Sequence, residues 1–245
     1  MSGRNGHRAE LVLFDAGGVL LLPDAAEILR ALEQFGIDSD LTTIDRAHYA
    51  AMAAVDQELE GRQITSGGLT SAMWDGTLRE AYRGVKKRSL GIPNDCPAEL
   101  EKAIFEARWT RVAPGALETL ATVAARNIPI GIVSNSDGTI EADLKAFNVC
   151  QVGPGAGTCV VRVVDSTVVG VAKPDPAIFA IALEAARVPA DRAMFIGDSV
   201  AIDVVGAAAA GIRPLHFDPF DFCGGRDHDD IRELAEVATI TESKA

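Results

Sequence analysis

The sequence predicts an α/β protein with a doubly wound parallel sheet and an inserted all-helical domain. Two observations carry this prediction. Short apolar segments alternate with helical segments after residue 114, and a long helical block, residues 24–109, follows the first strand. Strands that alternate with helices indicate a parallel sheet with helices on both faces. We therefore expect a core domain made of residues 1–21 and 110–245, and a helical domain made of residues 22–109.

The first strand is predicted at residues 10–15. Its sequence, ELVLFD, is an apolar run that ends in Asp15 before two glycines, which is typical of a buried parallel strand. Further strands are expected at residues 129–133, 159–164, 193–197 and 213–217, and helices at residues 116–126, 137–147, 176–187 and 201–211. The glycine-rich stretch 152–158 has no Lys and does not match a phosphate-binding loop, so it is interpreted as an ordinary loop.

The inserted block shows helical patterns and no convincing strand. Helices are expected at residues 24–35, 43–59, 69–88 and 97–109. The first three end near Gly36, Gly61 and Gly91, as helices often do.

The composition excludes several kinds of partner. The chain has 245 residues, with 23 Lys and Arg against 35 Asp and Glu, for a formal net charge of −12. Nucleic acids and anionic membranes attract clustered Lys and Arg, so we expect neither as a partner. The sequence predicts no membrane span and no signal peptide. The four cysteines form no CxxC pair and have no histidines at zinc spacing, so free thiols in a reducing cytoplasm are expected. The oligomeric state is not predicted.

Polar residues follow the carboxyl ends of the predicted strands, where they can lie close together at one edge of the sheet. They are Asp15, Ser134, Asn135, Lys173, Asp198 and Asp203. In an open parallel sheet the site lies beyond the carboxyl ends of the strands. Carboxylates there suit Mg²⁺, and a carboxylate can also act as a nucleophile. Phosphoryl transfer, which needs mainly positioning and charge neutralisation, fits this set.

Four segments of the chain resemble the motifs of one enzyme family. They are FDAGGVL at residues 14–20, VSNSDGT at 133–139, VAKPDPAIF at 171–179 and IGDSVAIDVVGAAAAG at 196–211. In this order, each after a predicted strand, they resemble the haloacid dehalogenase superfamily of hydrolases. The resemblance implies a Rossmann-like core with a helical cap of the C1 type, and it favours the phosphatase-like branch.

The resemblance implies a role for each residue of the set. Asp15 is the nucleophile that forms an aspartyl-phosphate, and Lys173 stabilises the developing charge. Ser134 holds a phosphoryl oxygen, and Asn135 belongs to the substrate-binding motif. The cofactor implied is Mg²⁺, with Asp15, the backbone carbonyl of Gly17, Asp198 and Asp203 as metal-site positions. Asp203 lies either near the metal or against Lys173. The implied substrate is a small phosphorylated metabolite such as a sugar phosphate.

One position departs from the family pattern. Family phosphatases usually carry a second Asp two residues after the nucleophile, as general acid and base, and this chain has Gly17 there. A positioned general acid contributes about 10²–10⁴ in rate. Three alternatives follow: a substrate with a better leaving group, an acid from the cap or the substrate, or a weak or lost activity.

Two other functions are weighed against phosphatase activity. A catalytically weakened homologue would bind a phosphorylated ligand or a protein. The other is a 2-haloacid dehalogenase. By resemblance, that branch of the family carries an aromatic residue at position 17 and a basic residue soon after the nucleophile. This chain has Gly17 and no Arg at residues 20–23, so dehalogenation is less favoured.

The helical block offers weaker candidates for contact with the substrate. They are His48, Tyr49, Trp74, Tyr82, Arg83, Lys86 and Lys87. Ordinary helix packing is favoured for Trp74 and Tyr82, and a solvated face for residues 83–88. His216 ends the last predicted strand, where a structural role at the rim is favoured.

Overall fold

The computed structural model describes residues 9–60, 74–224 and 228–242. In this part of the chain the main sheet has six strands in the order β10-β9-β8-β1-β4-β7. These are β1 (Leu11–Phe14), β4 (Ile130–Ser134), β7 (Arg162–Asp165), β8 (Ala193–Gly197), β9 (Arg213–Phe217) and β10 (Asp230–Ile231). Every pairing between them is parallel. The predicted fold class is therefore confirmed.

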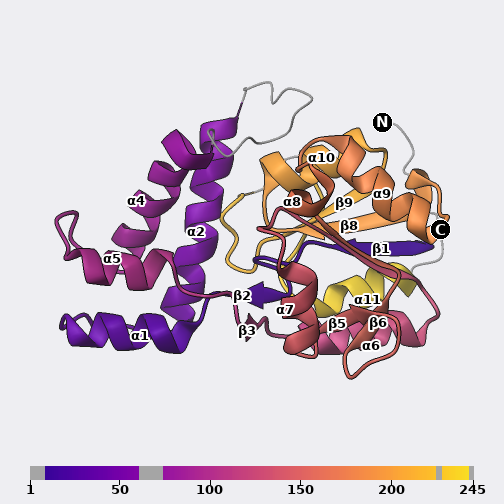
Figure 1. Cartoon of the computed structure of the whole chain (residues 1–245). Coiled ribbons are helices and arrows are strands. Elements are labelled where there is room, and N and C mark those ends of the chain that lie inside the picture. Colours follow the sequence, from indigo (N-terminus) through magenta and orange to yellow (C-terminus); the bar gives the residue numbers. More distant parts are fainter. Residues whose placement is uncertain (1–8, 61–73, 225–227, 243–245) are drawn as a thin grey trace.

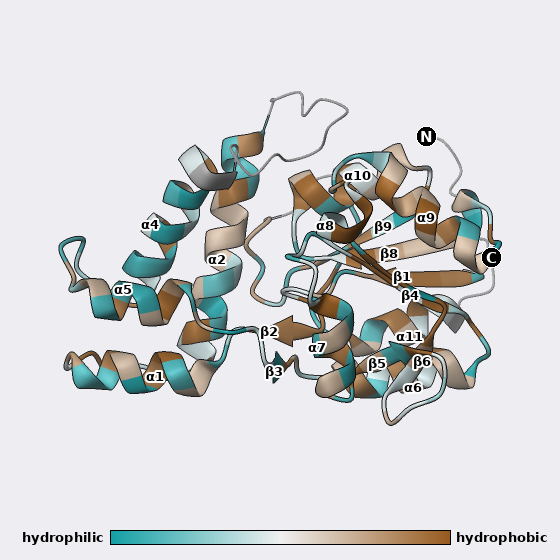
Figure 2. Cartoon of the chain, viewed as in Figure 1, coloured by the Kyte–Doolittle hydropathy of each residue, from teal (hydrophilic) through white to brown (hydrophobic). Residues whose placement is uncertain are grey.

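Helices cover both faces of the sheet (Figure 1). One face carries α6 (Ala116–Ala125), α7 (Ile140–Ala146) and α11 (Ala235–Glu242), and the other carries α8 (Ser166–Val169), α9 (Pro176–Ala186) and α10 (Val205–Ala209). The central strand β1 serves both layers, because Val12 and Phe14 pack in one apolar cluster while Leu11 and Leu13 pack in the other. This alternation follows from the two-residue period of a strand. Figure 2 shows the result as hydrophobic strands between helices with mixed surfaces.

A group of helices lies beside the sheet rather than on its faces (Figure 1). It contains α1 (Ala25–Gln34), α2 (Leu41–Leu59), a short π-helical segment η1 (Trp74–Leu78), α4 (Arg79–Ser89) and α5 (Ala98–Phe105). Apolar residues of α1, α2 and α5, including Ile28, Ile44 and Leu100, form a core of their own. Hydrogen bonds to the Asp24 and Asp40 carboxylates begin α1 and α2. We call these helices the cap. The division at residues 21/22 and 109/110 stays a prediction.

The chain enters and leaves the cap through a small antiparallel ribbon. Its strands, β2 (Leu21–Leu22) and β3 (Arg111–Val112), were not predicted. Each is two residues long, which is too short for a hydrophobic period to be visible. Arg111 pairs with Asp45 of α2, so the ribbon also contacts the cap.

Several predicted elements differ from the structure. The strand expected at residues 159–164 is wrong as one strand: β6 (Thr158–Val160) pairs with β5 (Cys150–Val152) in a separate small sheet, and only β7 joins the main sheet. The helix expected at 97–109 ends at Phe105, and the helix expected at 201–211 is a π-helical segment, η3 (Val200–Val204), followed by α10. The helix expected at 69–88 is η1 and α4 from residue 74, and its first residues lie outside the described part. A 3-10 turn, η2 (Ala190–Arg192), leads into β8. Among the described helices none is long and apolar enough to cross a membrane.

Candidate active site

A buried lysine holds two carboxylates at the carboxyl ends of the central strands. Lys173 Nζ lies 3.0 Å from Asp15 Oδ2 and 2.7 Å from Asp203 Oδ1. Asp15 follows β1 directly, and Asp203 lies in η3 behind β8. Lys173 is 1% exposed, so both ion pairs are shielded from solvent. Of the two positions expected for Asp203, the structure has the one against Lys173.

Asp198 completes a group of three carboxylates with Asp15 and Asp203. One carboxylate oxygen of each lies within 4.8 Å of the others. Asp198 follows β8, and β8 pairs with β1, so the sheet places Asp198 beside Asp15. Gly18 permits this approach: its φ is +76°, and a Cβ there would lie 1.9 Å from Asp198 Oδ2.

This buried group contains more acidic side chains than basic ones. Burial raises the pKa of Asp198 well above its usual value, and the charge of Asp15 adds to the effect. Burial also raises the pKa of Asp203 to about 7, although Lys173 opposes this. For Lys173, burial alone lowers the pKa, but Asp15 and Asp203 outweigh it and the pKa is raised. Three carboxylates thus face one ammonium group.

This donor set fits a divalent metal. Mg²⁺ prefers oxygen ligands and typically uses one or two protein carboxylates. A divalent cation would also offset the negative charge of the neighbouring carboxylates, which adds to the effect of burial on the pKa values of Asp198 and Asp203. Asp15 and Asp198 are placed to hold such an ion, and Asp203 completes the acidic group. The backbone carbonyl of Gly17, two residues beyond Asp15, stays a prediction.

Ser134 and Asn135 follow β4, the other neighbour of β1. Ser134 is buried at the strand end. The Asn135 side chain bonds the backbone of Lys173 in both directions: Nδ2 donates to the Lys173 carbonyl at 3.0 Å, and Oδ1 accepts from the Lys173 N–H at 2.8 Å. The amide group of Asn135 therefore positions Lys173.

The cap reaches the carboxylate of Asp198 through a chain of hydrogen bonds. His48 of α2 lies with Nε2 3.3 Å from Asp198 Oδ2, and its Nδ1 is 2.9 Å from the Tyr82 hydroxyl of α4. Burial lowers the pKa of His48 to about 3, with a smaller contribution from Lys86. A neutral imidazole that donates from Nε2 to the carboxylate accepts at Nδ1 from Tyr82. Tyr82, expected to pack ordinarily, is part of the site.

The aromatic ring of Trp109 lies beside Gly17, the position that departs from the family pattern. A Cβ on Gly17 would lie 3.4 Å from the Trp109 ring, which also contacts the His48 ring edge-on at 5.3 Å between centroids. Tyr49 donates from its hydroxyl to the Gly18 carbonyl at 2.7 Å. Side chains from α2 and from the segment after α5 thus surround the loop that follows Asp15.

A second carboxylate of α2 joins the cap to the core. Asp56 accepts hydrogen bonds from the Ser199 hydroxyl at 2.6 Å and from the backbone N–H groups of Val200 and Ala201 at 2.8 and 3.0 Å. These groups begin η3, where the unpaired N–H groups of a helix favour an anion. The cap is therefore anchored one residue beyond Asp198.

The sequence model of one protein family, the haloacid dehalogenase-like hydrolases, matches residues 9–211 of the chain. These residues include both the sheet edge and the cap. The chain belongs to this family. The expected resemblance is therefore confirmed, and the chain is a haloacid dehalogenase-like hydrolase.

Two curated relatives of this hydrolase carry phosphatase names. A phosphoglycolate phosphatase of Rhodospirillum rubrum is 37% identical over 211 residues, which cover 82% of this chain and 76% of the relative. A phosphoserine phosphatase of Thermus thermophilus is 31% identical over 164 residues, or 66% of this chain and 63% of the relative's length. A solved hydrolase of the family, YfnB of Bacillus subtilis bound to magnesium, has a TM-score of 0.57 at 20% identity and covers 96% of this chain and all of its own, which shows a shared fold.

Sequence reasoning about this hydrolase missed Trp109, Asp56 and a cluster around Cys223. Trp109 was placed in a helix that ends earlier, and Asp56 lies within the helix expected at residues 43–59 but was not singled out. The spacing Cys223-x₄-His228 was a signal that could have been used.

Among the weaker candidates, His48 and Tyr49 contact the core. Lys87 pairs with Glu101 within the cap at 2.7 Å, and the Arg83 guanidinium lies over the Phe105 ring. The Trp74 side chain lies outside the described part.

Proposed function

We propose that this protein hydrolyses a small phosphate monoester, with Asp15 as the nucleophile and Mg²⁺ as the cofactor. The observation that carries the proposal is the buried Lys173 ammonium, which joins Asp15 to Asp203 at the ends of the central strands. A nucleophilic carboxylate, a fixed positive charge and an acidic metal site are the parts that phosphoryl transfer requires. The phosphatase names of two relatives support the same reaction.

In the proposed reaction, an Asp15 carboxylate oxygen attacks phosphorus, and the bond between phosphorus and the ester oxygen breaks. The leaving alkoxide takes a proton from solvent water, since position 17 carries no acid, and a water molecule then hydrolyses the aspartyl-phosphate, which returns Asp15 and releases phosphate. Lys173 pairs with the nucleophile and offsets charge on the phosphoryl oxygens. Ser134 donates to one of these oxygens. Bound Mg²⁺ would neutralise phosphoryl charge at Asp15, Asp198 and the Gly17 carbonyl.

This chain differs from the usual family phosphatases in the group that gives a proton to the leaving group. With Gly17 beside the Trp109 ring, the usual second carboxylate is replaced by hydrogen and an aromatic face. We infer that the rate depends steeply on the leaving group. The substrate is a small phosphorylated metabolite in the cytoplasm, where the four free thiols would stay reduced.

The test is Mg²⁺-dependent phosphate release from aryl, acyl, glycosyl and alkyl phosphates, with 2-phosphoglycolate and phosphoserine in the panel. Asp15→Asn serves as the blank, and Asp191→Asn, at an exposed position, as the matched control. Release confined to better leaving groups, and abolished only in Asp15→Asn, supports the proposal. Release from alkyl esters at equal rates contradicts the inferred leaving-group dependence. Full activity in Asp15→Asn contradicts the mechanism, and halide release without Mg²⁺ would indicate a dehalogenase. A bound but uncleaved phosphate ligand would indicate a weakened homologue.

A further inference from the structure

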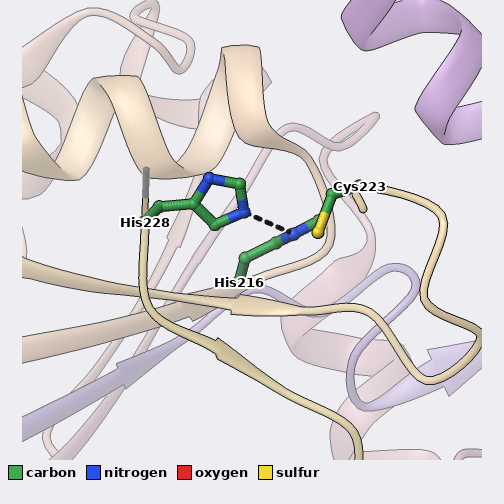
Figure 3. Close-up of side chains that lie close together, drawn as sticks. All are labelled: His216, Cys223 and His228. Atoms are coloured by element: carbon green, nitrogen blue, oxygen red, sulfur yellow. Dashed lines mark hydrogen bonds between the residues drawn. The ribbon is translucent and has the colours of Figure 1, made fainter. Parts of the chain in front are cut away.

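A second group of metal-ligating atoms lies outside the carboxylate cluster. His216 ends β9, Cys223 lies in the loop that follows, and His228 precedes β10. One ligand atom from each lies within 4.8 Å of the other two, and Figure 3 shows the three side chains converging. His216 is buried, and Cys223 and His228 are half-buried. Nothing in the proposed phosphatase reaction uses this group.

The hydrogen bonds of His216 indicate which nitrogen is available to a ligand. Its Nε2 lies 3.3 Å from the backbone carbonyl of Asp198, which can only accept, so Nε2 carries the hydrogen. Nδ1 then offers a lone pair toward His228 Nε2, 3.1 Å away. Histidines that bind metals usually donate their other ring N–H to a carbonyl or carboxylate in this way.

The separation of the two nitrogens matches a tetrahedral metal. Zinc binds histidine nitrogen at about 2.0–2.1 Å, so two such nitrogens at tetrahedral angles lie about 3.3–3.4 Å apart. The observed 3.1 Å needs only a small adjustment. Zinc binds a neutral imidazole and a thiolate, so metal binding would release the thiol proton of Cys223.

We propose that His216 Nδ1, Cys223 Sγ and His228 Nε2 bind one Zn²⁺ ion. Two imidazoles and a thiolate form a nitrogen and sulfur set that selects zinc over magnesium, whereas the three carboxylates of the active site form the opposite set. Water occupies the fourth position. It can enter from a hollow between α2 and the core, which His216 and Cys223 help to line.

The role of this zinc is to hold the loop between β9 and β10 against the cap. Phe220 and Phe222 of the loop lie under the Arg46 guanidinium of α2, and Tyr49 contacts the Phe220 ring at 5.8 Å between centroids. His216 is in turn bonded to the Asp198 backbone. The ion would therefore connect a loop that packs on the cap to the strand end beside the catalytic carboxylates.

The experiment uses the full chain, stripped with a chelator and titrated with Co²⁺ as a spectroscopic probe and then with Zn²⁺. We expect the charge-transfer band from thiolate to cobalt and the tetrahedral visible bands to saturate at one equivalent of Co²⁺, and to be abolished by Zn²⁺ but not by Mg²⁺. Cys223→Ser removes the charge-transfer band, and His228→Gln weakens binding at least tenfold. Both positions are half-buried, so neither change threatens the core as a change at His216 would.

Two controls separate this site from others. Cys159→Ser, at an exposed free cysteine, and Asp15→Asn, in the catalytic cluster, should both keep the cobalt spectrum. Zn²⁺ should raise the melting temperature of the wild type and leave that of Cys223→Ser unchanged. The proposal is overturned if the wild type shows no charge-transfer band, or if the band survives in Cys223→Ser. These readouts do not depend on phosphatase activity.

Discussion

The sheet edge and the cap meet at one site but contribute different chemistry. The sheet edge supplies charged groups: the Lys173 ammonium lies 3.0 Å from the Asp15 carboxylate and 2.7 Å from that of Asp203. The cap supplies His48, whose pKa burial lowers to about 3, and the Tyr82 hydroxyl, both uncharged at neutral pH. In the proposed reaction the reacting charges would lie at the sheet edge, while the cap would enclose and position them. Four substitutions test this division.

The largest expected effect comes from Lys173→Met on the sheet edge. Loss of one buried positive charge beside the nucleophile should lower kcat by about 10²–10³, the range for removing one electrostatic contact to the developing charge. Phosphate release from an aryl phosphate measures it, with exposed Lys145→Met as the matched control. A loss below fivefold in a folded variant would mean that the sheet edge does not supply the reacting charge.

The next effect concerns Gly17→Asp, which places a carboxylate beside the Trp109 ring of the segment after α5. If the missing acid limits the rate, activity on alkyl phosphates should rise about 10²-fold, at the low end of what a general acid contributes. The new side chain must share space with the Trp109 ring, so Gly17→Asp with Trp109→Ala is the companion variant. An unchanged dependence of the rate on leaving-group pKa in both variants would show that the acid missing at position 17 does not limit the rate.

Asp56→Ala tests how the cap is anchored. It removes hydrogen bonds from Ser199, Val200 and Ala201 to a buried carboxylate, and should cost about 2–3 kcal/mol of unfolding free energy. It should also raise KM more than it lowers kcat, because the cap positions groups but does not react. Urea unfolding and steady-state kinetics measure the two effects, with exposed Asp38→Ala as control. A fall in kcat at constant KM would argue that the anchor takes part in chemistry.

The smallest effect is a pH dependence inside the cap. Burial lowers the pKa of Lys86 from 10.5 to about 8, so the unfolded chain binds more protons between pH 8 and 10.5. The free energy of unfolding should therefore rise with pH between pH 8 and 10.5. Below pH 8 this gain should be absent. Lys86→Met should flatten the profile and add about 1–2 kcal/mol at pH 7, because a charge no longer has to be buried. Exposed Lys102→Met should leave the profile unchanged.

Local patterns predicted the main elements where a strand or helix was long enough to show its period. The strand at residues 193–197 coincides with β8, and the first strand and helix differ from β1 and α1 by only one or two residues at their ends. The two-residue strands β2 and β3 carry no period. The division of residues 158–165 into β6 and β7 depends on which neighbour each half pairs with, and pairing over long distances leaves no local signal.

The α/β fold and the group of polar residues at one edge of the sheet could be predicted from the sequence alone. Asp15, Lys173, Asp198 and Asp203 could be placed together in advance because the carboxyl ends of parallel strands share one edge, whatever the side chains between them. Only the tertiary structure decided that His48, Tyr82 and Asp56 reach that edge, and that His216, Cys223 and His228 converge. A helix presents side chains all around its axis, and a loop has no period, so their partners depend on how separate elements pack together. That packing is set by shape and burial across the whole molecule, and no single segment contains it.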